Sequence, residues 1–213
     1  MGNKIHPVGL RLPLTRDWRS RWFAERGDYR KLLLQDLKLR ELIMGKLRPA
    51  GVSRVDIERS LNALSVKIHV AKPGLVIGRG GAGLEDLRKL LEKETGQKLK
   101  LDIEEVRQPD LNAYLVARNI ADQIERRMPT KRIMNQAMER TIRSGAKGVK
   151  ILVAGRIGGA EISRREKVQW GTIPMATLRA NIDFASVPAK TATAGVTGVK
   201  VWIYADKKEE ELG

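Results

Sequence analysis

Apolar positions along the first half of the chain recur with two different periods. Residues 52–58 and 64–70 alternate between apolar and polar side chains, which predicts two half-buried strands. Before them, Pro49 ends a predicted helix over 28–47, for which Asp28 is a candidate N-cap. Helical spacing gives that helix an apolar face made of Leu32, Leu33, Leu37, Leu42, Ile43 and Leu47.

A glycine-rich stretch from Val76 to Leu84 separates these strands from a second helical pattern. Leucines at 84, 87, 90 and 91 recur at helical spacing, and Gly96 closes that helix. Residues 98–106 alternate again as a third strand. The predicted order is helix, strand, strand, glycine turn, helix, strand, an α/β unit of about seventy residues and the size of a small RNA-binding module.

The second half predicts a separate α+β unit that begins after Gln108–Asp110. Apolar spacing indicates one helix over 111–128, stopped by Pro129, and a second helix capped by Thr130. Further on the period becomes two. Short strands are predicted at 149–153, 168–173, 178–184 and 198–204, forming an antiparallel sheet covered by the two helices.

The glycine turn fits two motifs. Gly78 and Gly81 bracket the Gly-x-x-Gly loop with which KH domains hold a nucleic-acid backbone. Gly78, Gly80 and Gly83 also match a dinucleotide fingerprint, which needs a strand running directly into the turn. Pro73 reads as a break before the turn, and this favours the KH interpretation.

The net charge of the chain indicates what kind of partner it binds. The 213 residues include 41 Lys and Arg against 25 Asp and Glu, a formal net charge of +16. Such a surplus indicates a polyanion, first nucleic acid and second an anionic membrane surface. The chain lacks an apolar run long enough to span a bilayer and lacks a secretory signal, so we expect a cytoplasmic protein.

No catalytic constellation emerges. The chain has no cysteine, and its two histidines, His6 and His69, have no zinc-ligand spacing. A phosphate-binding loop of the Gly-x-x-x-x-Gly-Lys type is also absent. We therefore expect no enzyme activity, no metal and no cofactor, and His69 reads as a packing or surface residue.

One helical flank is strongly basic. Between residues 126 and 150 there are eight Lys or Arg and one acid, Glu139. Helical spacing places several polar side chains of the second predicted helix on one face: Arg132, Gln136, Arg140 and Arg143, with Lys131 beside them and Arg126 and Arg127 just before. The alternatives are a nucleic-acid surface and an ordinary solvated face.

Residues 1–27 form a basic arm without a sustained period. Its arginines, Arg11, Arg16, Arg19 and Arg21, could touch phosphates, and its aromatic residues, Trp18, Trp22 and Phe23, could stack on bases. The opposite interpretation, that these side chains anchor the arm to the protein's own core, is equally open.

Five blocks of sequence are similar to the family of bacterial small ribosomal subunit protein number three. They are Gly2-Asn3-Lys4-Ile5-His6-Pro7, the runs 71–81 and 153–161, Leu178-Arg179-Ala180-Asn181-Ile182-Asp183, and the run 195–203. The resemblance covers nearly the whole chain. It implies a type-two KH domain followed by an α+β domain in the head of the small ribosomal subunit.

The resemblance also implies partners. These are small-subunit rRNA, small-subunit proteins ten and fourteen, and messenger RNA at the entry tunnel, where the protein assists passive unwinding. The family's messenger-contacting basic positions correspond here to Lys131, Arg132 and Asn135, and Asn135 stands where relatives often have lysine. An RNA chaperone that acts outside the ribosome is the alternative function.

The expected domains are a basic arm (1–27), a KH domain (28–107), an α+β domain (108–206) and a nearly neutral charged tail (207–213). The predicted RNA contacts lie in the glycine turn, the basic flank and the arginines after the run 149–153. They are Lys72, Gly78, Arg79, Gly80, Gly81, Arg126, Arg127, Lys131, Arg132, Asn135, Arg140, Arg143, Arg156, Arg164 and Arg165.

Overall fold

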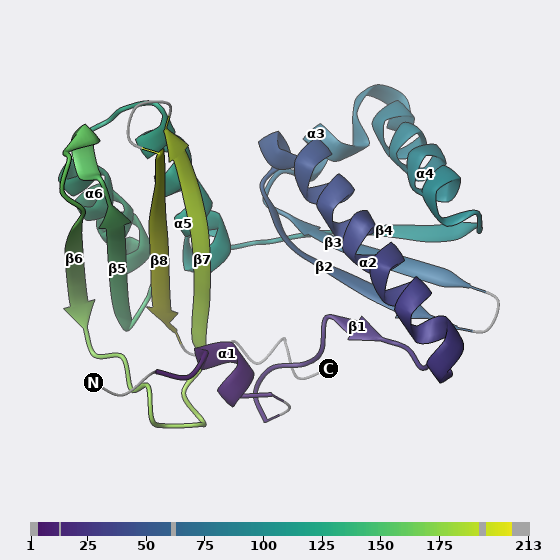
Figure 1. Cartoon of the computed structure of the whole chain (residues 1–213), viewed down its shortest axis with the longest axis horizontal. Coiled ribbons are helices and arrows are strands. Elements are labelled where there is room, and N and C mark those ends of the chain that lie inside the picture. Colours follow the sequence, from purple (N-terminus) through teal and green to yellow (C-terminus); the bar gives the residue numbers. More distant parts are fainter. Residues whose placement is uncertain (1–3, 13, 61–62, 192–194, 206–213) are drawn as a thin grey trace. The chain divides into compact units, whose positions relative to one another are not determined.

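The computed structural model consists of two compact units (Figure 1). One unit is Trp18–Arg107, and the other combines Met1–Asp17 with Gln108–Gly213. The structure describes residues 4–12, 14–60, 63–191 and 195–205. The segment expected to form a single arm, 1–27, is therefore shared between the two units, and the predicted tail lies outside the described residues.

The first unit is an α/β layer built on a four-stranded sheet. The strands are β1 (Ser20–Arg21), β2 (Val52–Arg59), β3 (Leu64–Val70) and β4 (Leu99–Glu105), in the order β1-β2-β3-β4. β2 and β3 are antiparallel, whereas β1 pairs with β2 and β4 with β3 in parallel. The helices are α2 (Arg26–Lys46), α3 (Pro73–Ile77) and α4 (Ala82–Thr95), and Figure 1 shows α2 and α4 against the sheet.

The alternation predicted for the strands of this unit sets its core. Val66, Ile68 and Val70 on β3 have no exposed surface, and Ile57 on β2 is equally buried. They pack in one cluster with Leu87 and other apolar residues of the helices. Full burial of each aliphatic side chain stabilises the fold by about 1.5–3 kcal/mol, so the period-two pattern specifies this layer.

The face of α2 that meets the sheet was predicted only in part, because Ile43 is buried as expected but the predicted leucines are not fully buried. The buried residues are Asp36, Leu39 and Ile43, while Leu33 and Leu37 are 38% and 55% exposed. Asp36 is buried because Arg59 and the indole nitrogen of Trp22 bond to its two carboxylate oxygens. Asp28 is also not the cap: the helix begins at Arg26, and its N-cap, Glu25, makes no side-chain capping bond.

The segment before the glycine turn also differs from expectation. Pro73, read as a break, is the first residue of the short helix α3, where proline is tolerated because the first N–H of a helix has no internal partner. The glycine turn therefore joins two helices, α3 and α4, and the expected order lacked one helix.

The second unit is an α+β layer, as predicted. Its strands β5 (Gly148–Gly155), β6 (Arg164–Gly171), β7 (Ile182–Thr191) and β8 (Gly195–Tyr204) form an antiparallel sheet in the order β6-β5-β8-β7. α5 (Ala113–Glu125) and α6 (Thr130–Arg143) lie behind this sheet in Figure 1, and α1 (Pro7–Leu10) lies beside β7.

Helices α5 and α6 cover one face of the sheet only. Val149, Ile151 and Val153 of β5 pack with Ala117 and Ile133 of the helices in one buried cluster. The alternate positions of the strands, such as Lys150 and Leu152, therefore point to the other face.

Several predicted boundaries in this unit were wrong. Asn112, whose side chain accepts bonds from Tyr114 and Leu115, caps α5, and Pro129 rather than Thr130 is the N-cap of α6. The strand expected at 178–184 begins only at Ile182 and continues to Thr191. The strand contains Pro188, which is tolerated because β7 is an edge strand, where a missing N–H costs little.

Candidate nucleic-acid interface

The glycine turn between α3 and α4 is built from left-handed backbone conformations. Gly78, Gly80 and Gly81 have φ values of 69°, 61° and 83°, a region that L side chains rarely adopt. Gly83 has a different role: a Cβ there would meet the carbonyl oxygen of Val76 at 2.7 Å, so the start of α4 lies directly against α3. The four glycines together permit a tight, exposed turn.

This turn presents suitable chemistry for a phosphate backbone. Gly78, Arg79 and Gly80 are all exposed, and so is Lys72 at the N-cap of α3. The backbone can approach a ligand closely at the glycines, and the 14-residue helix α4 directs its positive end toward the turn. Because a helix precedes the turn, the strand that the dinucleotide motif requires is missing, and that alternative is wrong.

Two exposed apolar side chains flank the turn on α3. Leu75 is 61% exposed and Ile77 is 41% exposed. The sequence reasoning missed them because a five-residue helix has no measurable period, and the helix itself had been read as a loop. They give the turn an apolar wall beside its cations, which suits the sugar and base edges of a single strand.

The basic flank predicted on the second helix lies on the solvent side of α6. Lys131, Arg132, Asn135 and Arg143 are exposed, and Arg140 is half-buried, while Ile133, Met134 and Ala137 of the same helix are in the core. Among the described residues, the exposed cations of this flank make one ion pair, a long contact of 3.9 Å between Arg143 and Glu139. The flank therefore carries charge that the described part of the protein does not neutralise.

Arg126 and Arg127 lie in the turn that joins α5 to α6, next to Lys131 and Arg132. Arg127 has φ 63°, the one positive φ of a described residue other than glycine. The N–H groups of Arg127 and Met128 donate to the carbonyls of Ile124 and Gln123, which closes α5 in a Schellman motif. Glycine is usual at this position, so Arg127 holds a strained backbone conformation.

The predicted arginines of the sheet separate into different roles. Arg156 donates from Nε to the carbonyl of Ala160 at 2.9 Å and so closes its own turn. Arg164 and Arg165 are exposed at the start of β6, opposite Gly155 and Ala154 of β5. Their side chains consequently point to opposite faces of the sheet.

The arm's side chains divide between the two interpretations left open by the sequence. Arg11 is fully buried and bonds to backbone carbonyls, so it cannot contact a phosphate. Trp22 bonds to Asp36 and packs near Tyr29, which anchors it to α2. By contrast Trp18 and Phe23 are 61% and 90% exposed and stay candidates for stacking.

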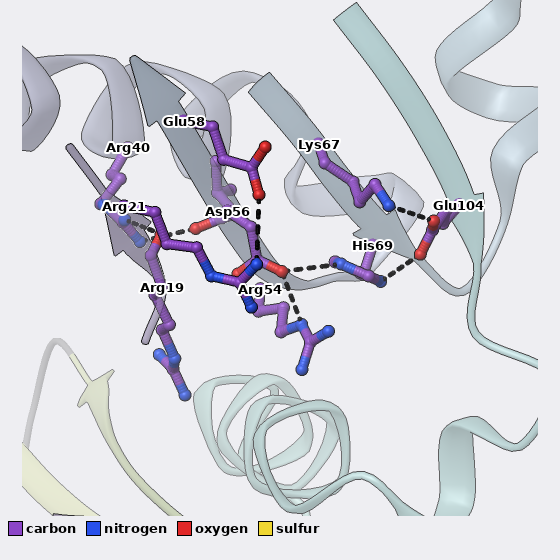
Figure 2. A network of polar contacts seen from close by, with 10 residues as sticks. Arg19, Arg21, Arg40, Arg54, Asp56, Glu58, Lys67, His69 and Glu104 are labelled. Atoms are coloured by element: carbon purple, nitrogen blue, oxygen red, sulfur yellow. Dashed lines mark hydrogen bonds and ion pairs between the residues drawn. The ribbon is translucent and has the colours of Figure 1, made fainter. Parts of the chain in front are cut away.

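The helix-free face of the first sheet carries a network of paired acidic and basic side chains (Figure 2). His69 lies between two carboxylates, with Nε2 3.0 Å from Asp56 and Nδ1 3.1 Å from Glu104. Arg54 also pairs with Asp56, and Lys67 pairs with Glu104 at 2.7 Å. Arg54 and Lys67 are thus already paired with acids of this face, and His69 is part of a surface network, as predicted.

The acids of this network have displaced pKa values. Burial alone would raise the pKa of Asp56, but the hydrogen bond to His69 and the charge of Arg54 outweigh it, and the pKa is lowered from 3.8. The hydrogen bond from Lys67 lowers the pKa of Glu104 from 4.5. Both carboxylates are therefore held ionised at neutral pH.

Neither a metal-binding cluster nor a membrane-spanning helix occurs in the part of the chain that the structure describes. Within 4–12, 14–60, 63–191 and 195–205, no three His, Cys, Asp or Glu side chains are grouped so that they could hold a metal ion. In the same ranges, no helix has the length and apolarity to cross a membrane.

Comparison with known proteins gives matches over both units. A model described as KH domain matches residues 38–111, and a model described as ribosomal protein S3, C-terminal domain, matches residues 120–203. The chain is 54% identical over 205 residues to small ribosomal subunit protein uS3 of Caldicellulosiruptor saccharolyticus. It is 52% identical over 204 residues to the uS3 protein of Brevibacillus brevis. Each alignment covers 96% of this chain and 92% of the relative.

Proposed function

Because the chain belongs to the uS3 family of small ribosomal subunit proteins, we propose that it is a structural constituent of the small subunit that binds rRNA. It acts by binding and catalyses no reaction. The observation that carries the proposal is the exposed glycine turn, in which three left-handed glycines and Arg79 stand at the positive end of α4.

The glycine turn positions an RNA backbone and reads little sequence. Its N–H groups and Arg79 meet phosphates, and Leu75 and Ile77 meet the sugar and base edges beside them. Lysines and arginines replace counterions condensed on RNA, so affinity falls steeply with salt, by about 0.7 units of log slope for each phosphate neutralised on a single strand.

The solvent side of α6 contacts messenger RNA at the entry tunnel. Four cations, Arg126, Arg127, Lys131 and Arg132, lie in the turn before α6 and in its first turn, and Glu139 is the one acid between residues 126 and 150. Unwinding is passive: these cations hold single strands while the ribosome moves the message. Asn135 contributes no charge, so Arg126 and Arg127 share the role that a lysine there would have.

Further partners and a location are part of the same proposal. The protein lies in the head of the small subunit in the cytoplasm and contacts small-subunit proteins ten and fourteen. Lys72, Arg140, Arg143, Arg156, Arg164 and Arg165 complete the proposed set of RNA-contacting residues.

A charge-reversal variant of the turn tests the RNA-binding site. Arg79→Asp with Gly80→Asp changes the charge by −3 in an exposed loop, and Asp tolerates the left-handed backbone of Gly80 better than most residues. We expect a large loss of affinity for small-subunit rRNA at moderate salt, with the fold kept and thermal stability lowered only slightly by the left-handed backbone at position 80. The control, Lys93→Asp with Gln97→Asp at the other end of α4, has the same charge change. Equal losses in both variants would remove the turn from the site.

Sedimentation distinguishes the ribosomal role from an RNA chaperone acting elsewhere. In a sucrose gradient of a cell extract, a ribosomal constituent co-migrates with the small subunit at stoichiometric amounts. A chaperone would stay in the light fractions even when RNA binding is intact.

A further inference from the structure

The face of the second sheet that α5 and α6 leave open carries cations on all four strands. The register shows which side chains share it: Lys150 of β5 lies opposite Gln169 of β6 and Trp202 of β8, and Leu152 lies opposite Lys167 and Lys200. Paired residues of antiparallel strands point to the same side of a sheet. Lys190 of β7 and Arg165 of β6 fall on this same side by the alternation of their strands.

No acid of the described strands shares this face. Glu166 alternates with Lys167 and so points to the helix side, and Asp183 points to the helix side too, where it accepts a bond from the backbone of Ala113. Among the described residues, no acid forms an ion pair with Lys150, Lys167, Lys190 or Lys200. This arrangement contrasts with the first sheet, where acids and bases alternate and pair (Figure 2).

The cations crowd one another. Burial lowers the pKa of Lys150, and the charges of Lys4 and Lys167 lower it further. Lys4 comes from the N-terminal segment, whose His6 ring meets Phe184 of β7 edge-on at 4.9 Å between centroids. The segment thus adds a positive charge to a face whose lysines already repel one another. A bound anion would reduce this repulsion.

Two aromatic rings on this face are already in contact with other side chains. Nζ of Lys150 lies 4.9 Å from the centroid of the Trp202 ring, and Trp202 contacts Phe184 at 5.1 Å between centroids. These two rings are therefore not free to stack on unpaired bases. It presents a flat array of lysine ends, with adjacent strands about 4.8 Å apart, which fits negative charges spread over a surface.

We propose that this open face, formed by Lys150, Arg165, Lys167, Lys190 and Lys200 with Lys4 beside them, is a second RNA surface that binds the phosphate backbone of duplex RNA. It is distinct from the glycine turn and from the solvent side of α6. Duplex RNA fits because it displays phosphates at its surface and conceals its base edges, so that a flat lysine array with occupied rings can bind it by shape and charge alone.

A neutralising triple variant tests the proposal in the full-length chain. Lys150→Gln, Lys167→Gln and Lys200→Gln remove three charges from the open face, and the control Lys31→Gln, Lys38→Gln and Lys46→Gln removes three exposed lysines from α2. The probe is a blunt RNA hairpin, with affinity measured by fluorescence anisotropy over a salt series. Thermal denaturation of both variants verifies that they fold.

The open-face variant should reduce the slope of log affinity against log salt by about two to three units, since each phosphate contact contributes roughly 0.7–0.9. The control should leave the slope unchanged. An equal change in both variants, or none in either, would overturn the proposal. The open-face variant is then combined with Arg79→Asp and Gly80→Asp to distinguish the two sites. Additive losses of RNA affinity support two surfaces. No further loss in the combined variant would contradict a second surface.

A competition experiment tests whether the open face instead binds an acidic polypeptide, which lysines also attract. Unlabelled poly-glutamate is added to the hairpin complex at the same charge concentration as unlabelled hairpin. Displacement by the hairpin alone supports an RNA surface. If poly-glutamate displaces the probe equally well from wild type but not from the open-face variant, the face binds acidic protein and the proposal fails.

Discussion

The guanidinium of Arg11 donates from Nε to the carbonyl oxygen of Ala180 at 2.8 Å, across 169 positions of sequence. The same group donates to the carbonyls of Pro7, Met175 and Thr177 at 2.9–3.1 Å and to that of Pro174 at 3.4 Å. Its side chain is fully buried, and burial followed by the charge of Arg16 lowers the pKa of Arg11. An arginine of the basic arm is thus a structural clamp on the loop before β7.

Replacing Arg11 with lysine should destabilise the fold although the charge is kept. Lysine has three donors at one point, while the planar guanidinium reaches several carbonyls at once, so some carbonyls would stay buried without a partner. We expect the free energy of unfolding to fall by about 2–4 kcal/mol in chemical denaturation. The exposed Arg179→Lys, in the loop that Arg11 clamps, is the control and should change stability little.

Replacing Arg127 with glycine should have opposite effects on stability and on RNA binding. Glycine removes the strain of the left-handed backbone and should stabilise the protein by about 1 kcal/mol. Loss of the cation should weaken RNA binding and lower its salt dependence by about one unit. The neighbouring Arg126→Gly, at φ −81°, loses the same charge without relief of strain. A stability gain at 126 rather than 127, seen by thermal denaturation, would refute the argument.

Removing the cations at the start of α6 should affect structured messages most. Lys131→Ala with Arg132→Ala should slow translation of a reporter with a stable hairpin more than that of an unstructured reporter, because unpaired strands lose their counter-charge. Asn135→Lys adds a cation one turn beyond Lys131 and should act in the opposite direction. Equal slowing of both reporters would assign Lys131 and Arg132 to scaffolding.

Because of the network around His69, the free energy of unfolding should depend on pH in the acidic range. Asp56 and Glu104 have pKa values below 3.8 and 4.5 in the folded protein, so their ionised forms stabilise the fold above these values. That stabilisation is lost as the pH falls through the lowered pKa values, below about pH 4. In urea denaturation, wild type should lose its advantage over Asp56→Asn as the pH decreases from 6 to 3. A constant difference across this range would contradict the assignment.

Local pattern predicted much of this protein. The period-two runs at 52–58 and 64–70 specified their strands because alternate side chains of a strand must face opposite sides, and apolar ones gain free energy only when buried. The glycine turn could also be predicted from the sequence, because glycine alone readily adopts positive φ and lets two helices approach closely. The surplus of cations indicated a polyanionic partner from composition alone.

Tertiary structure decided which side of an element is covered and which charges are used internally. The leucines of α2 predicted one buried face. The face that packs on the sheet instead includes Asp36, which bonds to Arg59 and Trp22. The strand expected at 178 starts later because the carbonyls before it bind Arg11. The lysines of β5, β6 and β8 formed one surface only through strand register. Partners far apart in the chain make these choices, and no local period records them.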